Sequence, residues 1–132
     1  MDGIRSRDNV VYRCTYEVVW CPKYRRPVID GPVQERLDQI IKEVCAERDA
    51  PIIELETKPD QVRLHVGCDP RFGIHRLVKQ IKGRSSNLLR QEFPALRSRL
   101  PTLWTNAYFV ATVGDDTTSE AIERYVENQK NA

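Results

Sequence analysis

Polar side chains occupy every second position of the segment from residue 61 to residue 66, and aliphatic side chains fill the positions between them. The polar set consists of Gln61, Arg63 and His65. A period of two is that of a β-strand, so an amide, a guanidinium and an imidazole should share one face while the aliphatic set is buried. A guanidinium can stabilise a transferring phosphoryl group, and an imidazole can ligate a metal ion. The alternative is an ordinary half-solvated face of an antiparallel sheet.

Positive charge is concentrated in one part of the chain. The net charge is only +2, but residues 71–99 hold eight basic side chains and one acidic side chain, Glu92. Such a segment suits a polyanion, and nucleic acid is the first candidate; the alternative is a solvated helix face. A short stretch with Lys23, Tyr24, Arg25 and Arg26 adds an aromatic ring to three cations. It could contact phosphate and stack on a base, or be a plain surface loop.

Composition limits the classes of protein to consider. A chain of 132 residues with 40% hydrophobic content predicts one domain, residues 1–132, with a real core. No apolar run could span a bilayer, and residues 1–9 form neither a signal peptide nor an anchor, so we expect a cytoplasmic protein without membrane contact. The four cysteines show no paired spacing. They predict reduced thiols rather than a structural metal or a disulfide framework.

The elements that must position these residues can be read from periodicity. Strands are expected at residues 10–20, 51–57, 61–68 and 107–113, and helices after residue 30 and from residue 74 to Phe93-Pro94. In the first helix the apolar residues fall at helical spacing, and in the second an apolar face and a basic face coincide. The order β-α-β-β-α-β is that of an α+β ferredoxin-like sandwich, with helices on one face of an antiparallel sheet. Its other face needs a cover or a ligand.

A further helix is expected at about residues 118–130. Thr117 and Glu120 have the spacing of a capping box. Helical spacing then places Ile122, Tyr125, Val126 and Gln129 on one face, so Tyr125 and Gln129 should be neighbours. Tyr125 could be a simple amphipathic anchor, because spacing alone does not make a tyrosine a nucleophile.

Several motifs together resemble a known family. They are Trp20-Cys21-Pro22-Lys23-Tyr24-Arg25-Arg26-Pro27-Val28, Lys82-Gly83-Arg84-Ser85-Ser86, Leu103-Trp104 with Tyr108-Phe109-Val110-Ala111-Thr112-Val113-Gly114, and Tyr125-Val126-Glu127-Asn128-Gln129. In this order and spacing they resemble the HUH single-tyrosine transposases of small insertion sequences, insertion sequence 200-like. The resemblance covers nearly the whole chain, although each motif alone would be weak.

The resemblance implies a homodimer that binds a hairpin at the end of its element and cuts and rejoins single-stranded DNA. By motif match Tyr125 is the nucleophile, which would give a 5′-phosphotyrosine and a free 3′-hydroxyl. Its helix would be exchanged to serve the partner's site. The family binds Mg²⁺ or Mn²⁺ through two histidines and a glutamine, and the glutamine matches Gln129.

The histidine pair of the family is missing from this chain. Where the family pattern reads Asp-His-hydrophobic-His, the sequence reads Asp60-Gln61-Val62-Arg63. A guanidinium has no acceptor and stays charged, so Arg63 would repel a divalent ion. A displaced metal site from Asp60, Gln61, His65 and Gln129 is an alternative, with Arg63 in its midst. The sequence therefore predicts doubtful metal binding and weak or no cleavage.

Two classes of function stay open on these residues. One is an active transposase, in which Arg63 replaces the metal as the cation beside the phosphate. The other is an inactive or repurposed protein that still grips hairpin DNA. The residues expected to bind DNA in either case are Lys23, Tyr24, Arg25, Arg26, Arg76, Lys79, Lys82, Arg84 and Arg90. An RNA-binding ferredoxin-like domain is disfavoured, because no platform of stacking aromatics is evident on the central strands.

Overall fold

The computed structural model describes residues 5–7, 10–12, 14–112 and 118–131. The strands are β1 (Arg5–Arg7), β2 (Val10–Tyr12), β3 (Thr15–Trp20), β4 (Ile52–Lys58), β5 (Gln61–Gly67) and β6 (Phe109–Thr112). The helices are α1 (Gly31–Glu47), α2 (Ile74–Glu92), α3 (Ala95–Arg99) and α4 (Thr118–Asn128), with short 3-10 turns η1 (Lys23–Arg25) and η2 (Gln129–Asn131).

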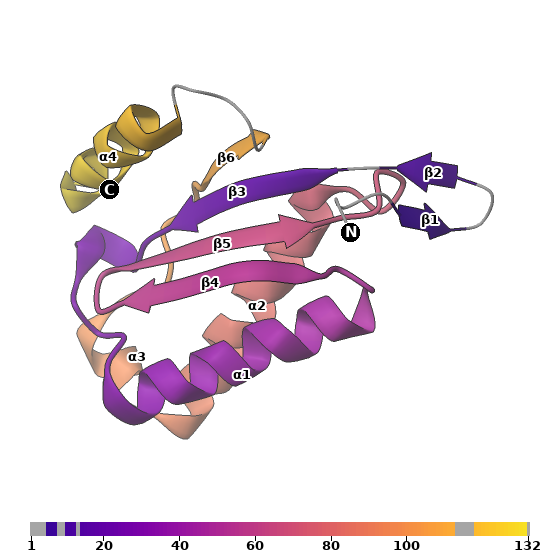
Figure 1. The fold of residues 1–132 in the computed structure, drawn as a ribbon. Coiled ribbons are helices and arrows are strands. Elements are labelled where there is room, and N and C mark those ends of the chain that lie inside the picture. The colour runs from indigo at the N-terminus through magenta and orange to yellow at the C-terminus, as the bar shows by residue number, and fades with distance from the viewer. Residues whose placement is uncertain (1–4, 8–9, 13, 113–117, 132) are drawn as a thin grey trace.

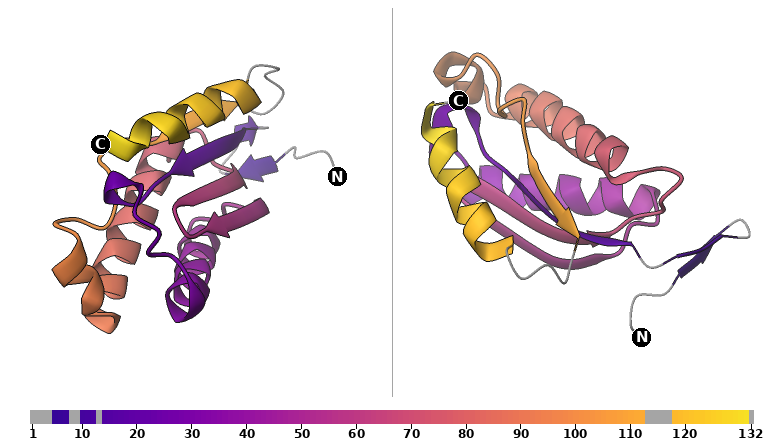
Figure 2. Two further views of the ribbon diagram at one scale, coloured as in Figure 1. Left: turned by 90° about the vertical axis from the view of Figure 1, so that its left-hand side faces the viewer. Right: turned by 90° about the horizontal axis from the view of Figure 1, so that it is seen from above.

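The main sheet has four strands in the order β4-β5-β3-β6, and every neighbouring pair is antiparallel. Helices α1 and α2 cover one face, and α4 lies over the other, as Figures 1 and 2 show. This is the α+β sandwich expected from the order of elements, so the predicted fold class is confirmed. The small β1-β2 hairpin extends beyond the main sheet (Figure 1).

The core between the sheet and the first two helices follows the predicted periodicities. From α1 it takes Leu37, Ile40, Ile41 and Val44, from α2 Leu77, Val78, Ile81 and Leu89, and from β5 Val62, Leu64 and Val66, all fully buried. Pro32 stands in the first turn of α1, where its missing N–H has no intrahelical partner to lose. The aliphatic positions of β5 thus face the helices, and the polar positions of β5 face the other side.

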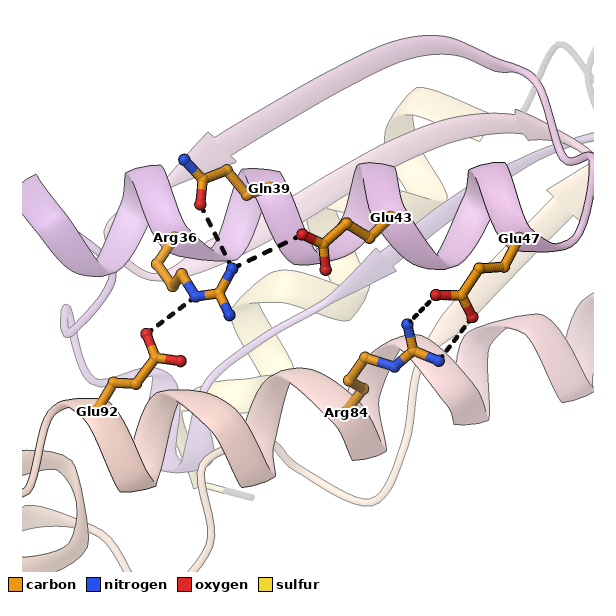
Figure 3. Close-up of polar contacts among 6 residues, drawn as sticks. All are labelled: Arg36, Gln39, Glu43, Glu47, Arg84 and Glu92. Atoms are coloured by element: carbon orange, nitrogen blue, oxygen red, sulfur yellow. Dashed lines mark hydrogen bonds and ion pairs between the residues drawn. The ribbon is translucent and has the colours of Figure 1, made fainter.

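Two ion-pair clusters join α1 to α2 across their exposed surface (Figure 3). Arg36 Nε donates to Glu92 Oε1 at 2.9 Å. Arg84 donates to both carboxylate oxygens of Glu47, at 2.7 and 2.8 Å. A bidentate pair of this kind fixes the guanidinium geometry, so these contacts hold the two helices in register.

Helix α4 covers the sheet face that the sequence left open. Its Ile122 and Val126 form a second buried apolar cluster with Val19 and Cys21 of the β3 side, and Phe109 and Tyr125 pack against this cluster. The expected helix at about 118–130 is therefore α4 followed by η2. Thr117 of the expected capping box lies outside the described residues.

Several expected boundaries were wrong. The single strand expected at residues 10–20 is two strands, because β2 pairs with β1 while β3 pairs with β5 and β6. The stretch after Pro94, expected to be a loop, contains α3. The last strand begins at Phe109 rather than Ala107, and the strand expected to reach residue 68 ends at Gly67. None of the described helices is long and apolar enough to cross a membrane.

Candidate functional site

A cleft of about 390 Å³ lies between α4 and the polar end of β5. It is lined by Arg25, Lys58, Gln61, Arg63, Ile122, Glu123, Val126 and Glu127. Gln61 and Arg63, two positions apart on β5, both face it, as the strand alternation predicts. The cleft is therefore where the family resemblance would place phosphoryl-transfer chemistry.

Arg63 is held by an acidic partner from the neighbouring strand. Its Nε donates to Glu17 Oε1 at 2.5 Å, and the side chains of Arg63 and Glu17 are 36% and 15% exposed. In the strand register Glu56 lies opposite Arg63 on β4. The hydrogen bond that Arg63 donates to Glu17 raises the pKa of Arg63, and the charges of Glu17, Glu56 and Glu54 raise it further. The guanidinium is fixed in its charged form and already has a counterion.

The remaining polar position of β5, His65, stands between two glutamates. Glu17 of β3 and Glu54 of β4 are its partners in the strand register. The Nε2 atom of His65 is buried and has no hydrogen-bond partner among the described residues. His65 does not line the cleft.

These residues do not fit a divalent metal ion. Position 63 carries a paired guanidinium, which has no lone pair to offer and repels a cation. Within the part of the chain that the structure describes, no group of three or more His, Cys, Asp or Glu side chains could hold an ion. Of the alternative ligands Asp60, Gln61, His65 and Gln129, only Gln61 lines the cleft. The Asp60 carboxylate instead accepts from Arg25 Nε at 2.8 Å.

Tyr125 packs beside Ile122 and Val126, which line the cleft, without lining the cleft itself. Its ring centroid is 6.1 Å from that of Phe109 on β6, and Tyr125 is not among the residues lining the cleft. Burial raises the pKa of Tyr125 to about 12; the nearby Thr105 side chain offsets part of the rise, and Cys21 adds to it. The contact with Thr105 lacks hydrogen-bond geometry, so the buried hydroxyl has no partner among the described residues.

Gln129, expected beside the nucleophile, is buried in η2. It is only 7% exposed, and its Oε1 atom has no hydrogen-bond partner among the described residues. The η2 turn packs against η1. Gln129 is thus brought close to the basic loop and away from the lining of the cleft.

The basic loop at residues 23–26 forms the tight turn η1. Tyr24 and Arg25 both have positive φ, 58° and 52°, which is uncommon for residues with a side chain. The turn leaves Tyr24 46% exposed, with Lys23 Nζ 5.0 Å from its ring centroid. Arg25 instead reaches back to Asp60 and, at 3.7 Å, to Glu127. Lys23, Tyr24 and Arg26 keep the exposure that contact with DNA requires, whereas Arg25 is paired internally.

Most basic residues expected to bind DNA from α2 have structural partners. Arg84 pairs with Glu47, and Arg76 lies 4.6 Å from the ring centroid of Phe72. Arg90 donates to the carbonyl of Pro101 at 3.1 Å. Lys79 is exposed.

Lys82 is tied to the segment that leads into β6. Its Nζ donates to the carbonyl oxygens of Thr105 and Ala107 at 2.7 and 3.1 Å. Burial lowers the pKa of Lys82 to about 8. Lys82 therefore links α2 to residues 105–107. Its charge is only partly available to a ligand.

Sequence reasoning missed Glu17, the residue that decides the state of Arg63. Alternation along residues 15–20 puts Glu17 on the same face as Val19, so its side of the sheet could have been read from the period. The identity of its partner on another strand could not.

Comparison with known proteins shows which family this chain resembles in sequence. A sequence profile of the IS200-like transposases matches residues 10–129. The ISDra2 transposase TnpA of Deinococcus radiodurans is 33% identical over 121 residues, which cover 90% of this chain and 86% of that protein. The transposase for insertion sequence element IS200 of Salmonella typhimurium is 28% identical over 131 residues, covering 98% of this chain and 85% of that protein.

Solved structures agree with the sequence relatives. A crystal structure of a transposase from Deinococcus radiodurans R1 superposes with a TM-score of 0.84 at 32% identity, covering 97% of this chain and 98% of that chain. A REP-associated tyrosine transposase bound to a REP hairpin shares the fold, with a TM-score of 0.60 at 12% identity over 92% of this chain and 69% of that chain.

Fold and relatives together define a transposase of α+β architecture. The chain belongs to the family of IS200-like transposases. This family is generally metal-dependent, and the described part of this chain shows no group of three or more His, Cys, Asp or Glu side chains that could hold an ion.

Proposed function

We propose that this chain is a single-stranded DNA transposase that binds hairpins at element ends, and that its capacity to cut and rejoin DNA through Tyr125 is impaired. The observation that carries the impairment is the ion pair between Arg63 and Glu17. By the family resemblance, Gln61 and Arg63 stand where two metal-binding histidines are expected. A paired guanidinium there cannot be exchanged for a metal ion without breaking a partly buried contact.

The chemistry assigned to Tyr125 is a transfer of one phosphodiester bond. The phenolic oxygen forms a bond to phosphorus, the bond from phosphorus to the 3′-oxygen breaks, and the phenolic proton passes to a base while the 3′-oxygen gains a proton. A hydroxyl whose pKa burial raises to about 12 is scarcely ionised at neutral pH. Tyr125 must therefore leave its buried place before it can react.

Arg63 is a poor substitute for the metal in this reaction. Its Nε is bonded to Glu17, so its positive charge is already balanced when a phosphate arrives. This supports the proposed impairment and argues against a fully active enzyme in which Arg63 is the essential cation. The second candidate is a catalytically inactive protein that binds hairpin DNA. Hairpin DNA is supported as the partner by the REP-associated tyrosine transposase of the same fold, whose structure was solved bound to a REP hairpin.

We also propose that the chain acts as a homodimer. Tyr125 does not line the cleft of its own chain, and in the family resemblance the helix that carries the tyrosine is exchanged to serve the partner's site. Sedimentation should then give a particle of twice 15.3 kDa. A monomer at micromolar concentration would refute the exchanged site.

Cleavage of an end-labelled single strand tests the proposed function. With Mg²⁺ or Mn²⁺ present, the unaltered chain should bind the hairpin portion and give little or no covalent adduct. Efficient cleavage that disappears in Tyr125→Phe would show that the chemistry is intact and the impairment wrong. Failure to bind any hairpin would reject both candidate functions.

A further inference from the structure

Two cysteines stand at the ends of the paired strands β3 and β5, away from the cleft. Cys14 directly precedes β3 and Cys68 directly follows β5, and both carry free thiols. The cleft residues Gln61 and Arg63 belong to the beginning of β5. Figure 1 shows that β3 begins and β5 ends on the side of the β1-β2 hairpin, whereas α4 lies toward the other end of the sheet. The two thiols are therefore outside the site already described.

The strand register places Cys14 opposite Cys68. Thr15 pairs with Gly67 in the antiparallel ladder between β3 and β5. Cys14 and Cys68 are the next residues outward, and Cys68 N donates to Cys14 O at 2.9 Å. On the other side of this strand end, Gly67 N donates to Pro51 O at 2.9 Å. The backbone that carries Cys68 is thus held from both sides.

The two side chains share the helix-covered face of the sheet. Tyr16 packs against the core cluster that contains Cys68, and strand alternation puts Cys14 on the same face as Tyr16. Burial raises the pKa of Tyr16, and the charges of Cys14 and Cys68 raise it further, so both thiols lie near one phenol. Opposed residues of a hydrogen-bonded antiparallel pair have Cα atoms about 5.5 Å apart, within the range of about 4.4 to about 6.8 Å that disulfides span.

The two thiols differ in access to solvent. Cys14 is half-buried, whereas Cys68 is only 2% exposed. Burial raises the pKa of Cys68 to about 11, and the charges of Asp69 and Cys14 add to the rise. Because the thiolate is the attacking species and needs access, Cys14 is the thiol that an oxidant meets first. Cys68 is placed to complete a bond that begins at Cys14.

Cys45 of α1 is the competing partner for Cys68. It is 1% exposed; burial raises its pKa to about 12, and the charge of Cys68 adds to this rise. Helix α1 lies in the layer beneath the sheet (Figure 1), and among the described residues no backbone hydrogen bond joins Cys45 to Cys68. The strand register therefore favours Cys14 over Cys45 as the partner.

We propose that Cys14 and Cys68 form a disulfide when the chain meets a low-molecular-weight disulfide such as oxidised glutathione. The Cys14 thiolate attacks one sulfur of the reagent, the S–S bond of the reagent breaks, and the displaced thiolate takes up the proton that Cys14 lost. Cys68 then attacks the Cys14 sulfur and displaces the second reagent thiolate, which takes up the proton from Cys68. The reagent is reduced to two thiols while two protein thiols become one disulfide. In a reducing compartment both cysteines stay thiols.

This inference is independent of the proposed function, and its consequence is a change in stability. The new bond closes a loop over residues 14–68, which contains β3, α1, β4 and β5. A crosslink restricts the unfolded chain, so the oxidised chain should melt about 5 °C or more above the reduced chain. Dithiothreitol should reverse the shift.

The test exposes the full chain to oxidised glutathione and counts free thiols after denaturation. The unaltered chain should lose two of its four thiols and remain a monomer on a non-reducing denaturing gel. Cys14→Ser should lose none, whereas the matched controls Cys21→Ser and Cys45→Ser should each still lose two. Mass spectrometry should find the peptide of Cys14 joined to that of Cys68, with chymotrypsin used to separate Cys14 from Cys21.

Three results would overturn the assignment. A disulfide that disappears in Cys45→Ser would identify Cys45 as the partner of Cys68. A lasting adduct of glutathione on Cys14 with Cys68 still free would show that the two sulfur atoms do not meet. Four free thiols after exposure to the reagent would show that Cys14 is not accessible. If Cys45→Ser does not fold, the peptide map of the unaltered chain decides between the two partners.

Discussion

A groove along α2, whose charged lining residues are Lys79, Lys82, Arg90 and Arg97, and the cleft beneath α4 use the same residue types to opposite effect. In the groove, cations lie against backbone carbonyls or solvent, and no acidic side chain is among its described lining residues. In the cleft, Arg63 pairs with Glu17, and Arg25 pairs with Asp60 and Glu127. One surface therefore presents uncompensated positive charge, while the other is internally neutralised.

This difference in charge means that the two surfaces suit different tasks, the groove DNA binding and the cleft phosphoryl transfer. A phosphate backbone needs only accessible positive charge and hydrogen-bond donors. Phosphoryl transfer at a tyrosine needs a cation that is free to meet developing charge, together with a reachable nucleophile. The cleft offers neither, because its guanidinium is paired and Tyr125, the proposed nucleophile, is buried and does not line it. We therefore expect changes in the cleft to alter chemistry and changes in the groove to alter affinity.

The largest effect should come from restoring imidazoles in the cleft. In Gln61→His with Arg63→His, two neutral nitrogen ligands would lie on one strand face, about 6.5 Å apart along the strand. Removal of the guanidinium also frees the Glu17 carboxylate. Metal-dependent covalent protein–DNA adducts should form at least about a hundredfold faster than with the unaltered chain, which is about 2.7 kcal/mol of barrier. Denaturing gels of labelled DNA measure this directly.

Single variants supply the controls for that experiment. Gln61→His alone should do little, because Arg63 still repels the ion. Adding Tyr125→Phe to the double variant should abolish the adducts, and survival of the adducts would overturn the nucleophile assignment. The unaltered chain could instead cleave DNA without metal and lose this activity in Arg63→Ala. Arg63 would then be a catalytic residue, and the contrast between the two surfaces would be wrong.

The next largest effect is that of salt concentration on hairpin affinity. It should depend on the groove and not on the cleft. If Lys79, Arg90 and Arg97 neutralise about three phosphates, the logarithmic slope of hairpin affinity should be about −2 to −3. Affinity would then fall about thirtyfold between about 50 and about 200 mM salt, as measured by fluorescence anisotropy. Gln substitution of Lys58, which lines the cleft, should leave this slope unchanged. An affinity indifferent to salt would contradict the proposed mode of binding.

The layers of this fold could be predicted from the sequence because they depend on local periodicity. The apolar spacing from Leu37 to Val44, and from Leu77 to Leu89, matches the helix faces that are buried. The alternation from Gln61 to Val66 correctly separated the buried face of β5 from the polar one. The split between β2 and β3 was missed, because a continuous β-branched run does not reveal where a strand changes its pairing partner.

The candidate site was only partly predictable, because its state depends on partners distant in sequence. Arg84 reads as a DNA-binding cation until Glu47 is seen across the helix pair (Figure 3). Arg63 reads as a free cation until Glu17 is found on β3. Tyr125 shares a helical face with Val126, and both pack in the apolar cluster under α4, but the sequence does not show that the Tyr125 ring meets Phe109 of β6. Local spacing gives the face of an element, and packing decides what that face meets.

A smaller effect should separate the ion pair of the cleft from those on the surface. Arg63→Gln should destabilise the chain by about 1.5 kcal/mol, because it leaves the poorly exposed Glu17 carboxylate without its charged donor. Arg84→Gln, which breaks the more exposed pair with Glu47, should cost only about 0.5 kcal/mol. Urea unfolding measures both changes. In the double variant with Glu17→Gln, most of the Arg63→Gln loss should return, and equal losses in all variants would mean that the pair contributes nothing.

The smallest effect at neutral pH is a change in stability on substitution of Tyr125. It tests whether the hydroxyl of this proposed nucleophile is buried without a partner. Tyr125→Phe removes a buried hydroxyl without a hydrogen-bond partner among the described residues, so it should stabilise the chain by about 1 kcal/mol.

In the folded chain burial raises the pKa of Tyr125 to about 12, whereas an unfolded tyrosine titrates near about 10. Between these values the folded state holds a proton that the unfolded state has lost, so the stability of the unaltered chain should fall relative to Tyr125→Phe as the pH rises through this window. The other tyrosines are present in both proteins and cancel in the difference. If Tyr125→Phe instead destabilises the chain at neutral pH, with no divergence between about pH 10 and pH 12, the hydroxyl is hydrogen-bonded or exposed in the folded chain, and its description as buried without a partner is wrong.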